Sequence, residues 1–237
     1  MKARWIGTQG YDDALSLQRE LHESRVAGEF PDTVLLLEHS SVITMGRRAV
    51  DSHVVSDEAT LAAAGVELRE TDRGGEATYH GPGQLVVYPI VDLRALDLGP
   101  VTYVAALEQA IIDTLGVYLV EAHRVSGRTG IWVDGDGADP GEGNNPSGRK
   151  IAAIGVRISR GVAMHGLALN VSTDLSMFNH IVPCGMPGLD ITSIEAEQGA
   201  APPVRIVAEE LAGKLAAALG VRYDGAVEIA TASLDPA

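Results

Sequence analysis

Cys184 is the only cysteine among the 237 residues, and its neighbours are Pro183 and Gly185. Proline before and glycine after the thiol indicate a turn, where a backbone N–H could face a developing oxyanion. A thiol attacks carbonyl carbons as its thiolate, which a nearby cation favours. Cys184 is therefore a candidate nucleophile. The alternative is an inert, buried apolar side chain, as most free cysteines are.

Four side chains are candidates for the cation beside this thiol: Lys150, His80, His165 and His180. The chain has three lysines and fifteen arginines, and lysine can exchange a proton where arginine cannot. Lys150 also begins an apolar run, residues 150–160, where partial burial would suit a proton shuttle. A solvated lysine at the end of a loop is the alternative interpretation.

The densest motif is Arg73-Gly-Gly-Glu-Ala-Thr-Tyr-His-Gly-Pro-Gly-Gln-Leu85. Its paired glycines would let a ligand or another backbone approach closely, although two tight turns around a short strand explain them as well. Tyr79 and His80 would alternate across that strand, so only one of them faces a pocket. For His165, a hydrogen-bonded core histidine fits the pattern as well as a functional one.

Residues 134–148, DGDGADPGEGNNPSG, imitate two ligand sites without completing either. The resemblance to a phosphate-binding loop fails because its lysine comes one position late and a strand-like run follows. The resemblance to a calcium loop fails at the required glycine and the final glutamate. Zinc motifs and a serine-nucleophile elbow are absent from the sequence. We expect no metal and no cofactor, and a flexible surface loop over 134–148.

Composition narrows the class of protein. The formal net charge of -14 disfavours binding to nucleic acid. No stretch approaches the roughly 20 apolar residues that a membrane span needs, and the N-terminus lacks the apolar segment of a signal peptide. A single cysteine cannot form an internal disulfide, which fits a reducing compartment. We expect a cytoplasmic protein that contacts neither membranes nor nucleic acids.

Apolar periodicity, turn residues and helix caps predict the elements that position these residues. Helices are expected over 11–27, from Ser56 to Gly65, from Thr102 to 116 and over 203–219. Strands are expected over 33–39, 41–46, 66–70, 77–81, 85–93, 117–123 and 130–133, and over a hairpin of 150–160 and 162–171. Interspersed strands and helices with direct strand connections predict an α+β fold. We expect a single catalytic domain, 1–237, with a large mixed, mainly antiparallel sheet packed by helices and a loose tail from about 225 to 237.

Four segments in this order resemble the lipoyl(octanoyl) transferase family: R-G-G-x-x-T-Y-H-G-P-G-Q, G-R-K-I-A-A-I-G-V, H-G-L-A-L-N-V and F-N-x-I-x-P-C-G. The resemblance runs from about residue 30 to 195 and implies the fold of biotin- and lipoate-protein ligases. It implies transfer of octanoyl from octanoyl-acyl carrier protein to a lysine of lipoyl domains of 2-oxoacid dehydrogenases and of the glycine-cleavage H protein. Cys184 corresponds to the thioester nucleophile and Lys150 to the lysine that activates it, with His165 as possible support.

The resemblance also implies which residues line the acyl substrate. They are Arg73, Gly74, Gly75, Glu76, Ala77, Thr78, Tyr79, His80, Ala153, Ile154, Gly155, Gly166, Leu167 and Ala168. The donor is already a thioester and the product is a more stable amide, so the reaction needs no ATP. Because the carrier protein is acidic, docking requires a local basic patch, for which the candidates are Arg47, Arg48, Arg149 and Arg73.

Three other functions remain as alternatives. An ATP-dependent lipoate- or biotin-protein ligase of the same fold would activate its acid as an adenylate and would not require a cysteine. A non-catalytic binding module would bury an inert Cys184. A cysteine hydrolase with a histidine partner would release free fatty acid without an acceptor.

Overall fold

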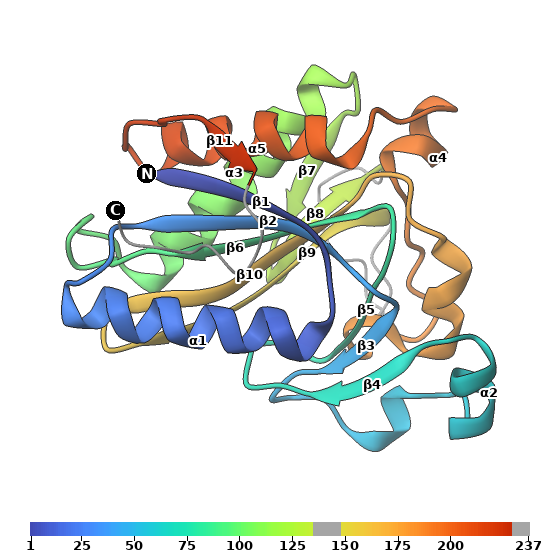
Figure 1. Ribbon diagram of the computed structural model, residues 1–237. Helices are drawn as coiled ribbons and strands as arrows, with labels where there is room; N and C mark the ends of the chain where they lie inside the picture. The colour runs from blue at the N-terminus through green and yellow to red at the C-terminus, as the bar shows by residue number, and fades with distance from the viewer. Residues whose placement is uncertain (135–147, 229–237) are drawn as a thin grey trace.

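The computed structural model describes residues 1–134 and 148–228, and its largest element is an eight-stranded sheet (Figure 1). The strand order is β11-β1-β2-β6-β10-β9-β8-β7. Only the β11-β1 and β1-β2 neighbours in this sheet are parallel, and the other neighbours are antiparallel. The predicted α+β fold with a mixed, mainly antiparallel sheet is confirmed. The strands are β1 (Lys2–Gln9), β2 (Thr33–His39), β6 (Gln84–Ile90), β7 (Ala122–Val125), β8 (Arg128–Val133), β9 (Arg149–Ser159), β10 (Val162–Asn170) and β11 (Ala226–Glu228).

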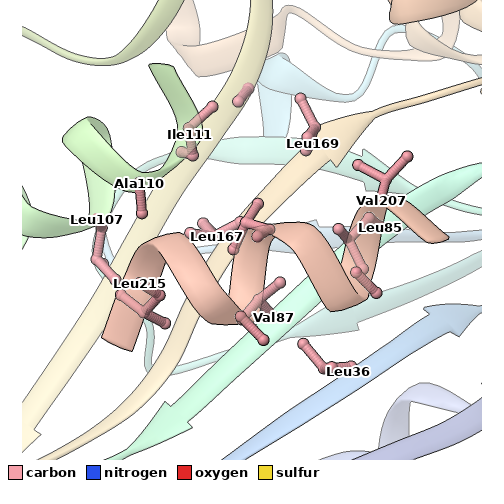
Figure 2. Packing of buried hydrophobic residues seen from close by; sticks show 14 of the residues in the cluster. Leu36, Leu85, Val87, Leu107, Ala110, Ile111, Leu167, Leu169, Val207 and Leu215 are labelled. Atoms are coloured by element: carbon pink, nitrogen blue, oxygen red, sulfur yellow. The ribbon is translucent and has the colours of Figure 1, made fainter. Parts of the chain in front are cut away.

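Helices cover both faces of this sheet, which is why its central strands are apolar at successive positions. In β2, Leu36 faces α3 (Pro100–Val117) and α5 (Val204–Ala218), while Leu35 faces α1 (Tyr11–Ala27). Figure 2 shows side chains of α5 packed on those of β2, β6 and β10. Fully burying one such side chain contributes about 1.5–3 kcal/mol to the free energy of folding. The apolar clusters on the two faces of the sheet therefore make it a stable support for a site.

A second sheet of three strands stands beside the large one. It contains β3 (Val42–Met45), β4 (Glu67–Glu70) and β5 (Ala77–His80), with β3 in the centre. Its apolar face packs with the short helix α2 (Glu58–Ala63) and with Phe178, whose ring meets Tyr79 edge to face. The sequence predicted these strands but not that they form a separate sheet. The 73–85 motif runs from the small sheet into β6 and so joins the two.

Several predicted ends and connections are corrected by the structure. Helix α2 is capped by Asp57, which accepts the Thr60 N–H at 2.8 Å, whereas the expected cap, Ser56, bonds His180 instead. Helix α3 starts at Pro100 after Gly99 rather than at Thr102, because proline suits a first helical turn. The strand expected over 117–123 overlaps the observed β7, Ala122–Val125, at two residues only, because α3 extends to Val117 and a turn follows it.

The remaining described elements are short helices. They are α4 (Ile194–Gln198) and three short 3-10 helices, Asp51–His53, Leu175–His180 and Pro183–Gly185. Residues 226–228, within the stretch expected to be a loose tail, pair with β1 as β11. The predicted flexible loop, apart from its end residues 134 and 148, and the tail beyond residue 228 lie outside the described residues. No helix in the described part of the chain has the length and apolar character to cross a membrane.

Candidate active site

A cavity of about 540 Å³ opens between the two sheets and brings the sequence motifs together. Cys184 and Lys150 both line it. So do most of the residues expected to line an acyl substrate, namely Arg73, Gly75, Glu76, Ala77, Thr78, His80, Ala153, Ile154, Gly155, Gly166, Leu167 and Ala168. Gly74 and Tyr79 are not among the lining residues. The Gly74 N–H bonds Val156 at 3.0 Å, and the Tyr79 ring lies against Phe178 in the small sheet's core.

Lys150 and Cys184 face each other although 34 residues separate them in the chain. The Lys150 Nζ lies 3.2 Å from the Cys184 Sγ and donates to the Thr129 carbonyl at 3.0 Å. It also sits 5.2 Å from the centre of the Trp132 ring, within cation–π range. Lys150 is 6% exposed. A cation so fixed and so little hydrated is well placed to stabilise a thiolate and to pass a proton.

The backbone at Cys184 is strained. Its φ of 54° and ψ of 22° are left-handed, a region that costs a residue with a side chain of order 1–3 kcal/mol. The turn is held by hydrogen bonds from the Gly185 N–H to the Val182 carbonyl and from the Met186 N–H to the Pro183 carbonyl. The turn expected from Pro183 and Gly185 is therefore present, and it turns the thiol toward Lys150.

Gly130 makes room for Lys150, a role that the sequence analysis missed. A Cβ on Gly130 would lie 2.6 Å from the Lys150 Cε and 2.6 Å from the Ala152 carbonyl oxygen. The φ of Gly130 is +115°, a conformation that suits glycine alone. A glycine inside a strand often marks a close approach, and that was the signal available at the start of Gly-Ile-Trp-Val.

Arg73 holds the motif loop together from inside. Its guanidinium donates to the Thr44 carbonyl at 2.7 Å and to the Thr44 hydroxyl, and also to the carbonyls of Gly74 and Glu76. Burial lowers the pKa of Arg73, but arginine remains protonated in proteins. Because these acceptors are uncharged, its positive charge is available to an anion in the cavity. Gly155 leaves room for the Arg73 side chain, since a Cβ on Gly155 would lie 3.2 Å from the Arg73 Cδ.

Two buried histidines lie beside Arg73 without adding charge. His80 bonds the Gln84 side chain at 2.7 Å, and burial, with His39 and Arg73 nearby, lowers the pKa of His80 well below its usual value. His39 bonds the Tyr88 hydroxyl at 2.7 Å, and burial lowers the pKa of His39 to about 4. No local sequence pattern distinguishes His39, because only the fold shows that it is buried. Both imidazoles are neutral at neutral pH.

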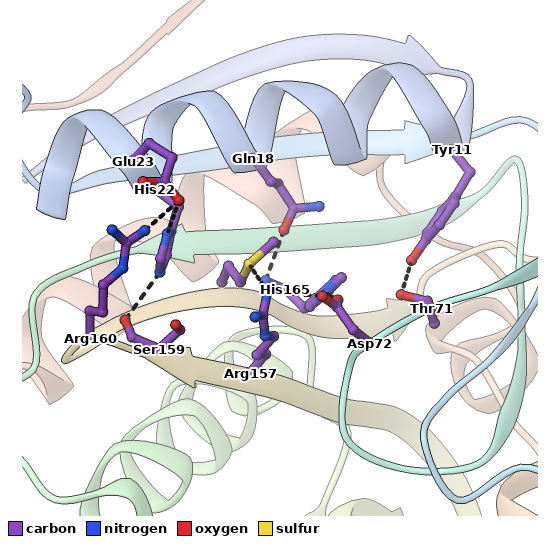
Figure 3. A network of polar contacts seen from close by, with 11 residues as sticks. Tyr11, Gln18, His22, Glu23, Thr71, Asp72, Arg157, Ser159, Arg160 and His165 are labelled. Carbon is purple, nitrogen blue, oxygen red and sulfur yellow. Dashed lines mark hydrogen bonds and ion pairs between the residues drawn. The ribbon is translucent and has the colours of Figure 1, made fainter.

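His165 is buried, lines the cavity and belongs to a polar network beneath α1 (Figure 3). Its Nε2 is 2.7 Å from the Asp72 Oδ1, and Asp72 forms an ion pair with Arg157 at 2.8 Å. Burial lowers the pKa of His165, although Asp72 acts in the opposite direction. Burial thus favours the neutral ring, and a proton on Nε2 is the one that the Asp72 carboxylate can accept. His180, the remaining candidate cation, instead bonds Ser56 and does not line the cavity.

The mouth of the cavity is basic. Arg48, 74% exposed in its side chain, and Arg128 line it, and Arg47 is exposed beside them. Arg149 instead pairs with Glu197 and Asp134, and Arg73 is buried, so these two do not belong to a surface patch. Among the described residues, no three His, Cys, Asp or Glu side chains gather as a metal site.

Comparison with known proteins shows to which family this chain belongs. Residues 10–216 match the model of the lipoyl protein ligase A/B catalytic domain. An octanoyltransferase of Chloroflexus aggregans is 46% identical over 220 residues, which cover 92% of this chain and 94% of the relative. One of Acidobacterium capsulatum is 47% identical over 199 residues, which cover 81% and 78%.

Solved structures agree on the fold. The bi-partite lipoate protein ligase of Thermoplasma acidophilum superposes with a TM-score of 0.69 at 17% identity, covering 96% of this chain and 86% of that one. A lipoate-protein ligase A bound with ATP also gives 0.69 at 17% identity, covering 97% and 90%. Identity this low shows the fold alone. The predicted resemblance to octanoyltransferases is thus confirmed, and the chain belongs to the lipoyl protein ligase A/B catalytic domain family.

Proposed function

We propose that this protein transfers an octanoyl group from octanoyl-acyl carrier protein to a lysine side chain of a lipoyl domain, through a thioester on Cys184. Lipoyl domains of 2-oxoacid dehydrogenases and the glycine-cleavage H protein are the proposed acceptors. The observation that carries the proposal is the 3.2 Å contact between the Lys150 Nζ and the Cys184 Sγ inside the cavity. The chain's octanoyltransferase relatives supply the reaction class.

In the first half-reaction, the Cys184 sulfur attacks the carbonyl carbon of the donor thioester. The carbon–sulfur bond to the carrier then breaks, and the proton held between Cys184 and Lys150 ends on the departing carrier thiol. The positive charge of Arg73, which lines the cavity, stabilises the oxyanion between these events. One thioester replaces another, so the step changes free energy little.

In the second half-reaction, the ε-amine of the acceptor lysine attacks the acyl-enzyme. Lys150 takes the amine's proton, and the Cys184 sulfur leaves with its bonding electrons and recovers a proton. The contacts of Lys150 with Thr129 and Trp132 keep its amine in place through both steps. The product is an amide, more stable than the thioester, so the donor's own activation drives the sequence without ATP.

The ATP-dependent ligase is the second candidate, because ligases share the fold. A ligase has no use for a cysteine beside a buried lysine, and curated relatives at 42–51% identity are octanoyltransferases. We further propose that residues 1–237 act as one catalytic domain, in the cytoplasm, where the lone thiol stays reduced. Arg47, Arg48 and Arg128 at the mouth are the proposed contacts for the acidic carrier.

Intact-protein mass spectrometry tests the proposal. Octanoyl-acyl carrier protein is mixed with the enzyme without ATP and without an acceptor. We expect an octanoyl adduct that hydroxylamine removes, that Cys184→Ser abolishes and that Lys150→Ala slows at least 100-fold, as loss of a general acid–base does. Lys214→Ala is the matched control, since Lys214 pairs with Glu210 on the surface of α5. An active enzyme that forms no adduct would refute the covalent route.

A further inference from the structure

We propose that His165 sets the longest acyl chain that this enzyme accepts, and that Gln18 and Asp72 position its ring for that task. The inference rests on the proposed function and deepens it, because it names the residue that selects the substrate's length. It depends on where the cavity is closed, on its length from Cys184, and on how His165 is held.

The cavity has an exposed end and a buried end. Ser126, Gly127 and Arg48 at the mouth are exposed, whereas Tyr11, Tyr88 and His165 at the other end are 2%, 5% and 1% exposed. The reacting atoms lie between these ends. Both protein substrates must reach Cys184 from the mouth, so the hydrocarbon tail of the acyl group extends toward the buried end.

The distance along the sheet matches a medium-length chain. A small cleft places Cys184 and Lys150 beside Ala153 and Ala168, which pair across β9 and β10. From Ala168 to His165 is three residues of strand, or about 10 Å at the usual rise, and that is the length scale of an extended eight-carbon chain. Gly166 and Leu167 line the cavity between them. The ring of His165 thus stands where the terminal methyl of an octanoyl group would end.

The backbone of His165 is held in an unusual conformation. Its φ is 56°, left-handed, in the middle of β10. Its N–H donates to the Gln18 Oε1 at 2.8 Å, and Gln18 descends from α1 with no exposed surface (Figure 3). A buried N–H needs a hydrogen-bond partner, and the bond to Gln18 supplies one only while the His165 backbone keeps this conformation. The helix therefore determines the direction of the His165 side chain.

The ring of His165 is fixed as well. Asp72 accepts its Nε2 proton at 2.7 Å, Arg157 holds Asp72, and the Tyr88 ring meets it edge to face at 6.3 Å between centroids. Burial lowers the pKa of the His165 imidazole, which favours the uncharged form of the ring beside the terminal methyl group. A ring with these two contacts, one of them to a carboxylate that is itself held by Arg157, acts as a rigid stop. A longer chain must displace it and break a buried hydrogen bond.

The left-handed backbone of His165 can be kept in two variants, because glycine and asparagine adopt this conformation readily. His165→Gly removes the stop, and His165→Asn shortens it while keeping a polar side chain. Acylation of Cys184 by octanoyl-, decanoyl- and dodecanoyl-acyl carrier protein is followed by intact-protein mass spectrometry. Each extra buried methylene favours binding roughly fourfold. We expect the decanoyl-to-octanoyl ratio of kcat/KM to rise about tenfold in His165→Gly and less in His165→Asn.

His22→Ala is the matched control. His22 lies one turn from Gln18 on α1, is 4% exposed and bonds the Ser159 carbonyl at 3.2 Å, but does not line the cavity. It should lower the thermal midpoint and leave the chain-length ratio unchanged, whereas Gln18→Leu should raise the ratio.

The outcomes separate the two proposals. If folded His165→Gly and His165→Asn are acylated with the wild-type ratio, His165 does not set the length and this inference is refuted. If the wild-type enzyme forms no adduct with any donor, the proposed function fails, and the length limit fails with it.

Discussion

Replacing Gly130 by alanine should disable the Cys184–Lys150 pair although neither of these two residues is substituted. The new Cβ would lie 2.6 Å from the Lys150 Cε and 3.0 Å from its Nζ. It would also lie 2.6 Å from the Ala152 carbonyl oxygen, so the Cβ cannot move away from the lysine in that direction. Ordinary van der Waals contact needs about 3.5–4.0 Å, so the lysine must move by about 1 Å. A misplacement of that size costs about 100-fold in rate. Strain at a φ of +115° adds a loss of stability of about 1–3 kcal/mol.

Rapid-quench mass spectrometry of the acyl-enzyme measures the rate, and urea denaturation measures the stability. Gly7→Ala is the control, because Gly7 also lies in a strand with positive φ, +69°, but its Cβ would meet nothing within 4 Å. It should lose stability and keep the acylation rate. A Gly130→Ala enzyme that acylates as fast as wild type would show that Lys150 does not need its present position.

Three further predictions follow from the site and its supports. Arg73→Lys should lower the free energy of unfolding by about 2–4 kcal/mol, because a lysine cannot replace the guanidinium's bonds to Thr44; urea denaturation measures the loss, and acylation should slow. The folded-state pKa of His39 is about 4 against 6.5 unfolded, so the unfolded chain binds the proton first as pH falls. Stability should fall between pH 6.5 and 4 by up to about 3 kcal/mol, and His39→Phe should flatten that part of a pH series of urea titrations. Asp57→Ala should cost about 1 kcal/mol through loss of the α2 cap and should leave acylation unchanged.

Local sequence patterns predicted the elements whose causes are local. Helix α1 has the predicted bounds, 11–27, because its apolar spacing and the glycine after it act within a few turns. The β9–β10 hairpin was predictable from two apolar runs around a short connection. Its turn residues Arg160 and Gly161 both have positive φ, as tight hairpins require.

Contacts between distant segments could not be predicted in the same way. The pairing of β1 with β11 joins residues at opposite ends of the chain, as Ala3 and Ala226 do. The separate small sheet depends on β3 pairing with both β4 and β5. The Lys150–Cys184 contact was inferred from family resemblance alone, and no local pattern contains Gly130's place beside the Lys150 amine. Propensity and periodicity act over a few residues, whereas these contacts depend on the finished topology.

The charged residues that line the cavity are mainly basic, whereas the whole chain is acidic, and both bear on the proposed docking of an acidic carrier protein. The chain carries -14 overall, which would repel an acidic carrier protein at long range. That repulsion is screened within about 8 Å at physiological ionic strength, so close contacts decide docking. There the mouth presents Arg48 and Arg128, and the described lining residues of the cavity include a single carboxylate, Glu76. The proposed donor would therefore meet only weak repulsion at long range and a basic mouth at close range. This predicts that added salt weakens binding if Arg47 and Arg48 make the contacts. A titration of octanoyl-acyl carrier protein at several salt concentrations, with Arg47→Gln and Arg48→Gln for comparison, measures this, and affinity that rises with salt in every variant would contradict it.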